Sequence, residues 1–164
     1  LIKLKNKDKL IVGDFKFKCC IGKNRVKKHK IEGDKSTPKG TFTLGTLYYR
    51  KDRVKKPTTN LKIKIIKPNM GWCNDIKSEK YNKQILFPFK YSAEKLYRKD
   101  ASYDIFIEIK YNYSPVIKGN GSAIFMHIAK KNYKPTEGCI ALSKKDLIKI
   151  LPLIKKNTKI SIRN

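Results

Sequence analysis

Apolar and polar residues alternate along several short segments of the chain, which is the pattern of β-strands. Residues 103–113, YDIFIEIKYNY, alternate most strongly and predict a central strand. Residues 61–66, LKIKII, have period two, so we expect one buried face and one lysine-coated face. The apolar runs SAIFMHIA (122–129) and TKISI (158–162) predict two further strands. The pattern therefore predicts a mostly β protein.

Turn-forming residues divide the first third of the chain into strands. Residues 9–22, KLIVGDFKFKCCIG, carry two apolar runs split at Gly13 and Asp14, which favours a hairpin. A second turn, TPKG at 37–40, precedes another β-rich run. The segment 67–84 is polar, turn-rich and aromatic, and long irregular segments of this kind are often functional.

Two segments are predicted to form short helices. Residues 92–100, SAEKLYRKD, predict one helix with Ser92 as its N-cap. In residues 143–154, SKKDLIKILPLI, Ser143 and Asp146 have capping-box spacing, with Asp in place of the usual Glu. Four apolar residues then recur at helical spacing: Leu147, Ile150, Leu151 and Ile154.

Length and composition predict a single domain over residues 1–164. This length is enough for a sizeable core, and no internal repeat or low-complexity linker divides the chain. The apolar runs are too short to span a membrane, and no signal-peptide pattern is present. Because the chain begins at Leu1 rather than Met, the missing signal pattern does not establish a cytoplasmic location.

The formal net charge of +27 predicts attraction to polyanions such as nucleic acid, anionic lipid or an acidic wall polymer. The lysines are spread along the whole chain, and most aromatic residues occupy alternating strand positions. This distribution favours a diffusely basic surface over a dedicated nucleic-acid groove. A non-catalytic nucleic-acid- or wall-binding module remains the rival hypothesis, and it would require clustered basic residues with exposed aromatic rings.

Cysteine and histidine are the candidate catalytic or metal-binding residue types. The adjacent Cys19 and Cys20 do not readily pair with each other, and a bridge from either to Cys73 stays open. His127 and Cys139 lack a second close-spaced ligand pair, so no metal site is predicted.

Cys139 follows a glycine and lies twelve residues after His127. His127 itself is near the end of a predicted strand. A thiol with a pKa of about 8.5 is mostly protonated at neutral pH, and a neighbouring imidazole can take its proton. Gly138 permits a positive φ, so the Cys139 backbone N–H can act as an oxyanion donor. On these residues alone, a buried core cysteine is the alternative interpretation.

Two separated motifs resemble the L,D-transpeptidase (YkuD-type) catalytic domain. His127 followed by TEGCI at 136–140 resembles that family's histidine, gap and Ser/Thr-x-Gly-Cys-aliphatic signature. Residues 32–45, EGDKSTPKGTFTLG, resemble its Thr-Pro-x-Gly-x-(Phe/Tyr) segment, and the order of the two motifs is correct. Further segments resemble a proteobacterial subgroup, so that the resemblance covers residues 29–151.

This resemblance implies a mostly β, YkuD-type fold, sandwich- or barrel-like, with no cofactor. Cys139 would attack an L-centre to D-centre peptide bond of a peptidoglycan stem peptide and form a thioester, with His127 as base. An amine acceptor gives a transpeptidase, whereas water gives an L,D-carboxypeptidase or a related peptidoglycan amidase. The resemblance also implies acylation by carbapenem-type inhibitors and a periplasmic or cell-wall location, with no nucleic-acid partner expected.

Five residues are predicted to contact the substrate: Thr136, Glu137, Trp72, Tyr111 and Asn112. Glu137 and Ala141 depart from the family's pattern, and a carboxylate at 137 would either repel an acidic terminus or bind an amine acceptor. Trp72 is either a stacking platform or a core residue. Tyr111 and Asn112 end the strand before that of His127, so we expect them in the same cleft, with an ordinary turn as the alternative.

Overall fold

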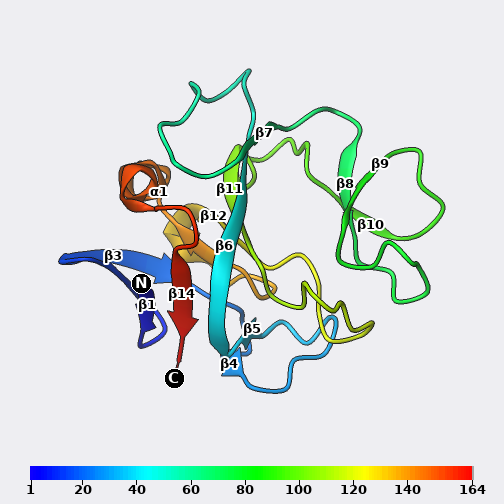
Figure 1. The fold of residues 1–164 in the computed structure, drawn as a ribbon, viewed down its shortest axis with the longest axis horizontal. Helices are drawn as coiled ribbons and strands as arrows, with labels where there is room; N and C mark the ends of the chain where they lie inside the picture. The colour runs from blue at the N-terminus through cyan, green and yellow to red at the C-terminus, as the bar shows by residue number, and fades with distance from the viewer. Residues whose placement is uncertain (164) are drawn as a thin grey trace.

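The structure, a computed structural model, describes residues 1–163 and is built around one nine-stranded sheet (Figure 1). Its strands are β1 (Ile2–Lys5), β2 (Lys9–Val12), β3 (Phe15–Cys20), β6 (Gly40–Tyr49), β7 (Ile63–Ile65), β11 (Ile105–Ile109), β12 (Phe125–Ile128), β13 (Ile140–Leu142) and β14 (Lys159–Ile162). Their order across the sheet is β11-β12-β13-β3-β2-β1-β14-β6-β7. Because β11 also pairs with β6, the sheet closes on itself and leaves β7 outside the ring.

Smaller elements complete the described chain, which is mostly β as predicted. β8 (Met70–Cys73), β9 (Gln84–Leu86) and β10 (Ala93–Lys95) form a three-stranded sheet, called the cap sheet below, and β4 (Val26–Lys27) pairs with β5 (Thr37–Pro38). The helical elements are α1 (Lys144–Ile150) and the 3-10 turns η1 (Lys131–Tyr133) and η2 (Leu151–Leu153). No helix among residues 1–163 is both long and apolar enough to cross a membrane.

The predicted N-terminal hairpin is confirmed. β2 and β3 pair with Val12 opposite Phe15, and Gly13 between them has a φ of +58°, which suits glycine. β3 then pairs with β13, with Cys20 opposite Ala141. The hairpin thus forms part of the wall that supports the segment after Cys139.

The predicted central strand is confirmed as β11, but neither face of this strand is exposed to solvent. All five of its residues are buried. Ile105, Ile107 and Ile109 belong to a large, mainly aliphatic cluster inside the closed sheet, called the main cluster. Phe106, on the opposite face, belongs to a second cluster, called the aromatic cluster. β11 therefore separates two apolar regions, whereas most amphipathic strands separate a core from solvent.

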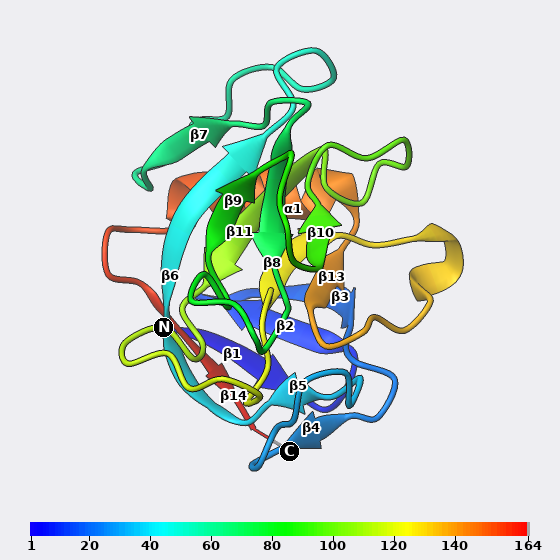
Figure 2. The same ribbon diagram turned by 90° about the vertical axis from the view of Figure 1, so that its right-hand side faces the viewer.

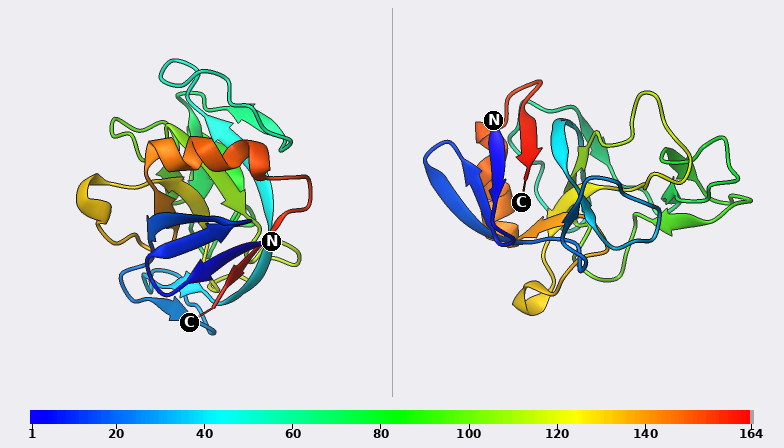
Figure 3. Two further views of the ribbon diagram at one scale, coloured as in Figure 1. Left: turned by 90° about the vertical axis from the view of Figure 1, so that its left-hand side faces the viewer. Right: turned by 90° about the horizontal axis from the view of Figure 1, so that it is seen from below.

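The predicted C-terminal helix is confirmed as α1. The Ser143 hydroxyl accepts a hydrogen bond from the Asp146 backbone N–H at 3.1 Å, which is the N-cap interaction that the spacing predicts. Leu147 and Ile150 are fully buried in the main cluster. Figure 3 shows the helix lying against one side of the closed sheet.

The predicted helix over 92–100 is wrong, because residues 93–95 form strand β10. β10 pairs antiparallel with β8, and this places Glu94 opposite Trp72. The Ser92 hydroxyl donates to the Asn74 side-chain carbonyl at 2.8 Å instead of capping a helix. An isolated helix of nine residues is marginal, so long-range strand pairing decides the local structure.

The segment 61–66 is a strand only at its centre, where β7 pairs with the end of β6. Leu61 is buried and Ile63 is half-buried, but Ile65 is 41% exposed and Ile66, on the expected lysine face, is buried. The predicted alternation fails because β7 is a three-residue edge strand whose chain turns away before a full face is formed.

The cap sheet lies beside the closed sheet, at the right of Figure 1 and in front in Figure 2. The aromatic cluster joins the two sheets. Its buried members are Tyr48, Ile66, Met70, Trp72, Leu96, Tyr103, Phe106, Phe125 and Cys139. Edge-to-face contacts of Trp72 with Tyr48 and Phe125 connect β8 to the strands beneath it. Cys139 therefore belongs to the apolar region between the sheets.

Candidate active site

A cavity of about 490 Å³ opens next to the aromatic cluster, and both His127 and Cys139 line it. Four segments that are distant in sequence provide its walls: residues 30–33, 94–103, 122–127 and 130–139, with Asn74 from the segment after β8. The two residues predicted to carry the chemistry are therefore brought to one site.

Neighbouring parallel strands position the thiol and the imidazole. In β12 and β13, His127 lies opposite Ala141, and Cys139 immediately precedes β13. The Cys139 thiol donates to the Ala123 carbonyl at 3.2 Å and accepts from the Phe125 N–H at 3.3 Å. Because alternate residues of a strand face the same side, His127 projects from the same face of β12 as Phe125.

The hydrogen bonding of His127 fixes its tautomer. Nδ1 lies 2.9 Å from the Ile128 carbonyl oxygen, which can only accept, so Nδ1 carries the proton and Nε2 is left unprotonated. The Tyr103 ring packs edge-to-face against the imidazole, with 5.3 Å between ring centroids. Burial lowers the pKa of His127 to about 4, so the ring is a neutral base at physiological pH.

The environment of Cys139 keeps its thiol protonated at rest. Burial raises the pKa of this thiol to about 12, and the Glu94 carboxylate acts in the same direction. The Phe125 N–H opposes this shift by donating to the sulfur. Among residues 1–163, no hydrogen bond joins the sulfur to the imidazole, and such bonds often tighten only when substrate binds. The resting pair is therefore neutral thiol and neutral imidazole.

The two sequence motifs meet at the turn that carries Cys139. Gly138 has a φ of +142°, as predicted, and a Cβ on it would lie 2.8 Å from the Ser36 carbonyl oxygen. The Gly138 carbonyl accepts from the Thr37 hydroxyl at 2.8 Å. The Thr136 hydroxyl accepts from the Gly138 N–H and donates to the Cys139 carbonyl. Thr37 and Thr136 thus hold the turn from both sides.

The other predicted contact residues divide into two groups. Thr136 and Glu137 line the cavity; Thr136 uses its hydroxyl within the turn, and the Glu137 side chain, 78% exposed, lies 3.6 Å from Lys35. The structure does not bring Trp72, Tyr111 or Asn112 to this cavity.

Trp72 is a buried core residue whose indole N–H donates to Asn82 at 2.9 Å. Tyr111 and Asn112 line a separate cavity, so the prediction that they share the cleft of His127 is wrong. The Asn112 amide donates to the Ile117 and Gly121 carbonyls, which makes it the turn residue of the alternative interpretation.

Glu94 is a cavity residue that sequence reasoning missed, because the segment containing it was assigned to a helix. Its carboxylate accepts a hydrogen bond from the Tyr103 hydroxyl at 2.6 Å. The signal that could have found it is the presence of an acidic residue in a strongly basic chain.

Within the described residues, no disulfide joins Cys19 or Cys20 to Cys73. The four cysteines are buried free thiols. Within residues 1–163, no group of three or more histidine, cysteine or acidic side chains could hold a metal ion.

The family model described as the L,D-transpeptidase catalytic domain (YkuD) matches residues 3–162. No curated protein and no solved structure matches the chain. The matched range includes both motifs and every segment of the cavity wall.

Proposed function

The chain belongs to the L,D-transpeptidase catalytic-domain family, and we propose that it is a cysteine L,D-transpeptidase that acts on peptidoglycan stem peptides through Cys139 and His127. The observation that supports this most directly is the shared cavity: the thiol and a neutral imidazole with an unprotonated Nε2 line the same walls. We further propose that residues 1–164 act as one catalytic unit, since the family match spans 3–162.

In the first half-reaction, His127 Nε2 takes the thiol proton as the Cys139 sulfur attacks the carbonyl of the L-centre to D-centre peptide bond. The neutral resting pair means that this proton moves during the attack. The Cys139 N–H, after the positive-φ Gly138, is proposed as a donor to the developing oxyanion. The His127 imidazolium then protonates the leaving D-residue amine, and a thioester remains on Cys139.

In the second half-reaction, His127 takes a proton from the acceptor amine as that amine attacks the thioester. A new peptide bond forms, the carbon–sulfur bond breaks, and the proton on His127 returns to the Cys139 sulfur. Water in place of the amine would release a shortened stem peptide, which is the carboxypeptidase alternative.

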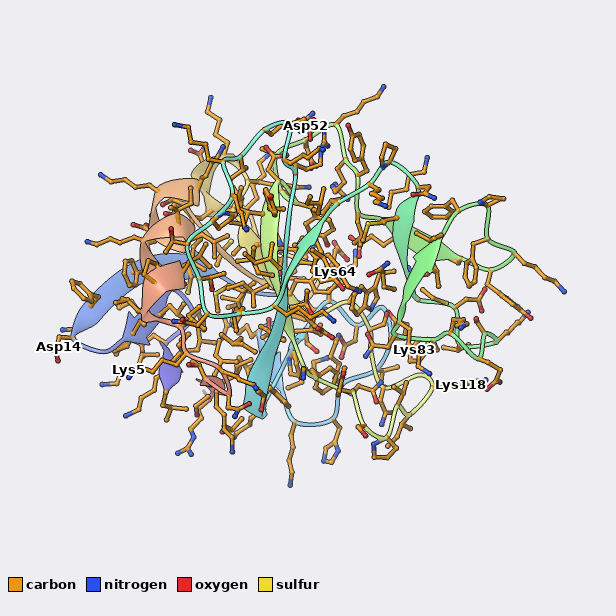
Figure 4. All side chains as sticks on the ribbon, turned by 45° about the horizontal axis from the view of Figure 1, so that its top comes forward. Lys5, Asp14, Asp52, Lys64, Lys83 and Lys118 are labelled. Atoms are coloured by element: carbon orange, nitrogen blue, oxygen red, sulfur yellow. The ribbon has the colours of Figure 1, made fainter. Side chains whose placement is uncertain are left out.

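The charge of the molecule fits an anionic wall substrate. Figure 4 shows lysine side chains, Lys5 among them, reaching outward around the outline of the molecule in that view. A net charge of +27 steers carboxylate-bearing stem peptides toward the enzyme. Domains of this family typically act in the periplasm or at the cell wall, and we propose that location here.

The test is digestion of purified muropeptides by the wild type, Cys139→Ala and Cys73→Ala. Cys73 is a matched control, because it is also a buried free thiol but does not line the cavity. We expect cross-linked or shortened products from the wild type and Cys73→Ala and none from Cys139→Ala. Equal products from all three proteins would refute the assignment of the nucleophile, and the ratio of cross-linked to shortened products identifies the acceptor.

A further inference from the structure

We propose that Glu94 binds an ammonium group on the stem-peptide donor, beside the scissile bond, and thereby selects substrates with an amine-bearing third residue. The inference rests on the proposed function and names one recognition contact of the same cavity. It is carried by the geometry of the Glu94 carboxylate and of the charged groups around it.

Glu94 presents a partly desolvated carboxylate to the cavity. It lines the cavity from β10, and its side chain keeps 29% of its surface exposed. Oε1 accepts from the Tyr103 hydroxyl at 2.6 Å. No group among residues 1–163 donates a hydrogen bond to Oε2. One carboxylate oxygen therefore remains open to a donor that enters the cavity.

The protein supplies no close cation that fully compensates this carboxylate. Arg98 approaches Glu94 with Nη1 only, at 3.9 Å. Its Nε and Nη2 form a bidentate pair with Asp100 at 2.9 and 2.7 Å. Glu94, Arg98 and Asp100 together carry one net negative charge. Within the described chain, no lysine nitrogen lies within 4 Å of Glu94, and cavity-lining Lys30 is paired with Asp34.

The position of Glu94 connects it to both reacting residues. Its partner Tyr103 packs directly against the His127 ring. Its negative charge also raises the pKa of the Cys139 thiol. An ammonium group bound at Glu94 would cancel this repulsion, so that the correct donor both docks and eases deprotonation of its nucleophile.

A purely structural role for Glu94 makes a different prediction. If Glu94 only orients Tyr103, then its replacement by glutamine affects every substrate equally. If it binds an ammonium group, the effect depends on that group. Two synthetic stem tetrapeptides separate these cases: they differ only at the third residue, which is lysine in one and norleucine in the other, so that an ammonium group replaces a hydrogen atom of the terminal methyl group.

The experiment measures binding of both peptides to Cys139→Ala protein, which cannot turn them over. We expect the lysine peptide to bind roughly tenfold to a hundredfold more tightly, the range for one charge-assisted hydrogen bond. Adding Glu94→Gln should abolish this preference without weakening the norleucine peptide. Adding Glu108→Gln should preserve it, because Glu108 is likewise a carboxyl on a strand, is buried, and lies outside the cavity.

Equal affinity for the two peptides, no binding of either, or a preference that survives Glu94→Gln would overturn the inference. An equal loss for both peptides in the Glu94→Gln protein would also overturn it and assign a structural role. The proposed function fails separately: it fails if wild-type protein gives no Cys139-dependent cleavage or transfer, whatever the binding preference. Thermal unfolding of each variant checks that the fold is retained.

Discussion

The main cluster and the aromatic cluster lie on opposite faces of β11 and differ in composition and surroundings. The main cluster is largely aliphatic, lies inside the closed sheet and contains the buried face of α1. The aromatic cluster is built from tyrosine, phenylalanine and tryptophan rings, joins the cap sheet to the closed sheet and contains Cys139. Regular strand pairing supports the first region, whereas side-chain hydrogen bonds hold the turn beside the second.

This difference indicates that the two faces of a single strand have different roles. The aliphatic face buries apolar area around regular backbone pairing and stabilises the fold. The aromatic face borders the cavity, where hydroxyl, carboxylate, imidazole and thiol groups meet in a partly desolvated site. Substitutions on the two faces should therefore separate stability from activity.

The largest expected effect is on activity, at Cys139. Cys139→Ala should lower acyl transfer by roughly a thousandfold or more, because Cys139 is the one thiol among the described residues that line the cavity. The free energy of unfolding should change by only about 1 kcal/mol. Muropeptide turnover and urea denaturation measure the two quantities. The comparison would be contradicted if Cys139→Ala were strongly destabilised and the molecules that remain folded still turned over substrate.

The next effect should have the opposite profile. Ile107→Ala removes a fully buried side chain from the main cluster and should cost about 2–5 kcal/mol of unfolding free energy. The protein that remains folded should keep near-normal turnover, since Ile107 does not line the cavity. Denaturant titration combined with activity per folded molecule tests this. A loss of activity without a loss of stability would contradict the division between the two faces.

The third effect concerns pH and belongs to the aromatic side. His127 binds a proton near pH 6.5 when unfolded and only near pH 4 when folded, so the unfolded state binds more protons between these values. Stability from this residue is therefore present above pH 6.5 and is lost as pH falls through 4. The expected loss is about 3 kcal/mol.

Other groups also titrate in this range. The measurement is therefore the change in unfolding free energy from pH 7 to pH 4, compared between the wild type and His127→Gln. His29→Gln is the matched control, because His29 is exposed. We expect His29→Gln to follow the wild type and His127→Gln to lose about 3 kcal/mol less on acidification. Parallel curves for all three proteins would show that His127 is not buried in its neutral form.

The smallest effect should come from the support of the catalytic turn. Thr37→Val removes the hydroxyl that donates to the Gly138 carbonyl and accepts from the Gly22 N–H. We expect a cost of about 1–2 kcal/mol in unfolding free energy and roughly a tenfold lower kcat. Thr58→Val, at an exposed threonine, should change neither. An unaltered kcat in Thr37→Val would mean that the turn does not depend on the earlier motif.

The sequence predicted best those features whose causes are local. The Gly13 hairpin and the Ser143 cap depend on residues only a few positions apart, and both are confirmed. The motif resemblance is confirmed by the family match over 3–162. The shared cavity of Cys139 and His127 agrees with the expected juxtaposition, while their catalytic roles stay a prediction.

The features that the sequence did not predict depend on contacts between distant segments. The strand at 93–95 forms because β8 offers a partner, although the local pattern favours a helix. The same pairing places Glu94 in the cavity wall. The bond from Thr37 to Gly138 spans 101 positions, and no local period encodes such a contact. Tyr111 was misplaced because the direction of the chain after β11 is set by the turn of Asn112.

The central claim is that Cys139 forms a thioester, and intact-protein mass spectrometry after incubation with a carbapenem tests it most directly. We predict the mass of one acyl group, located on the peptide that contains Cys139, in the wild type and in Cys73→Ala. Cys139→Ala should remain unmodified. Wild-type protein without an adduct, or with the adduct on another residue, would contradict the account.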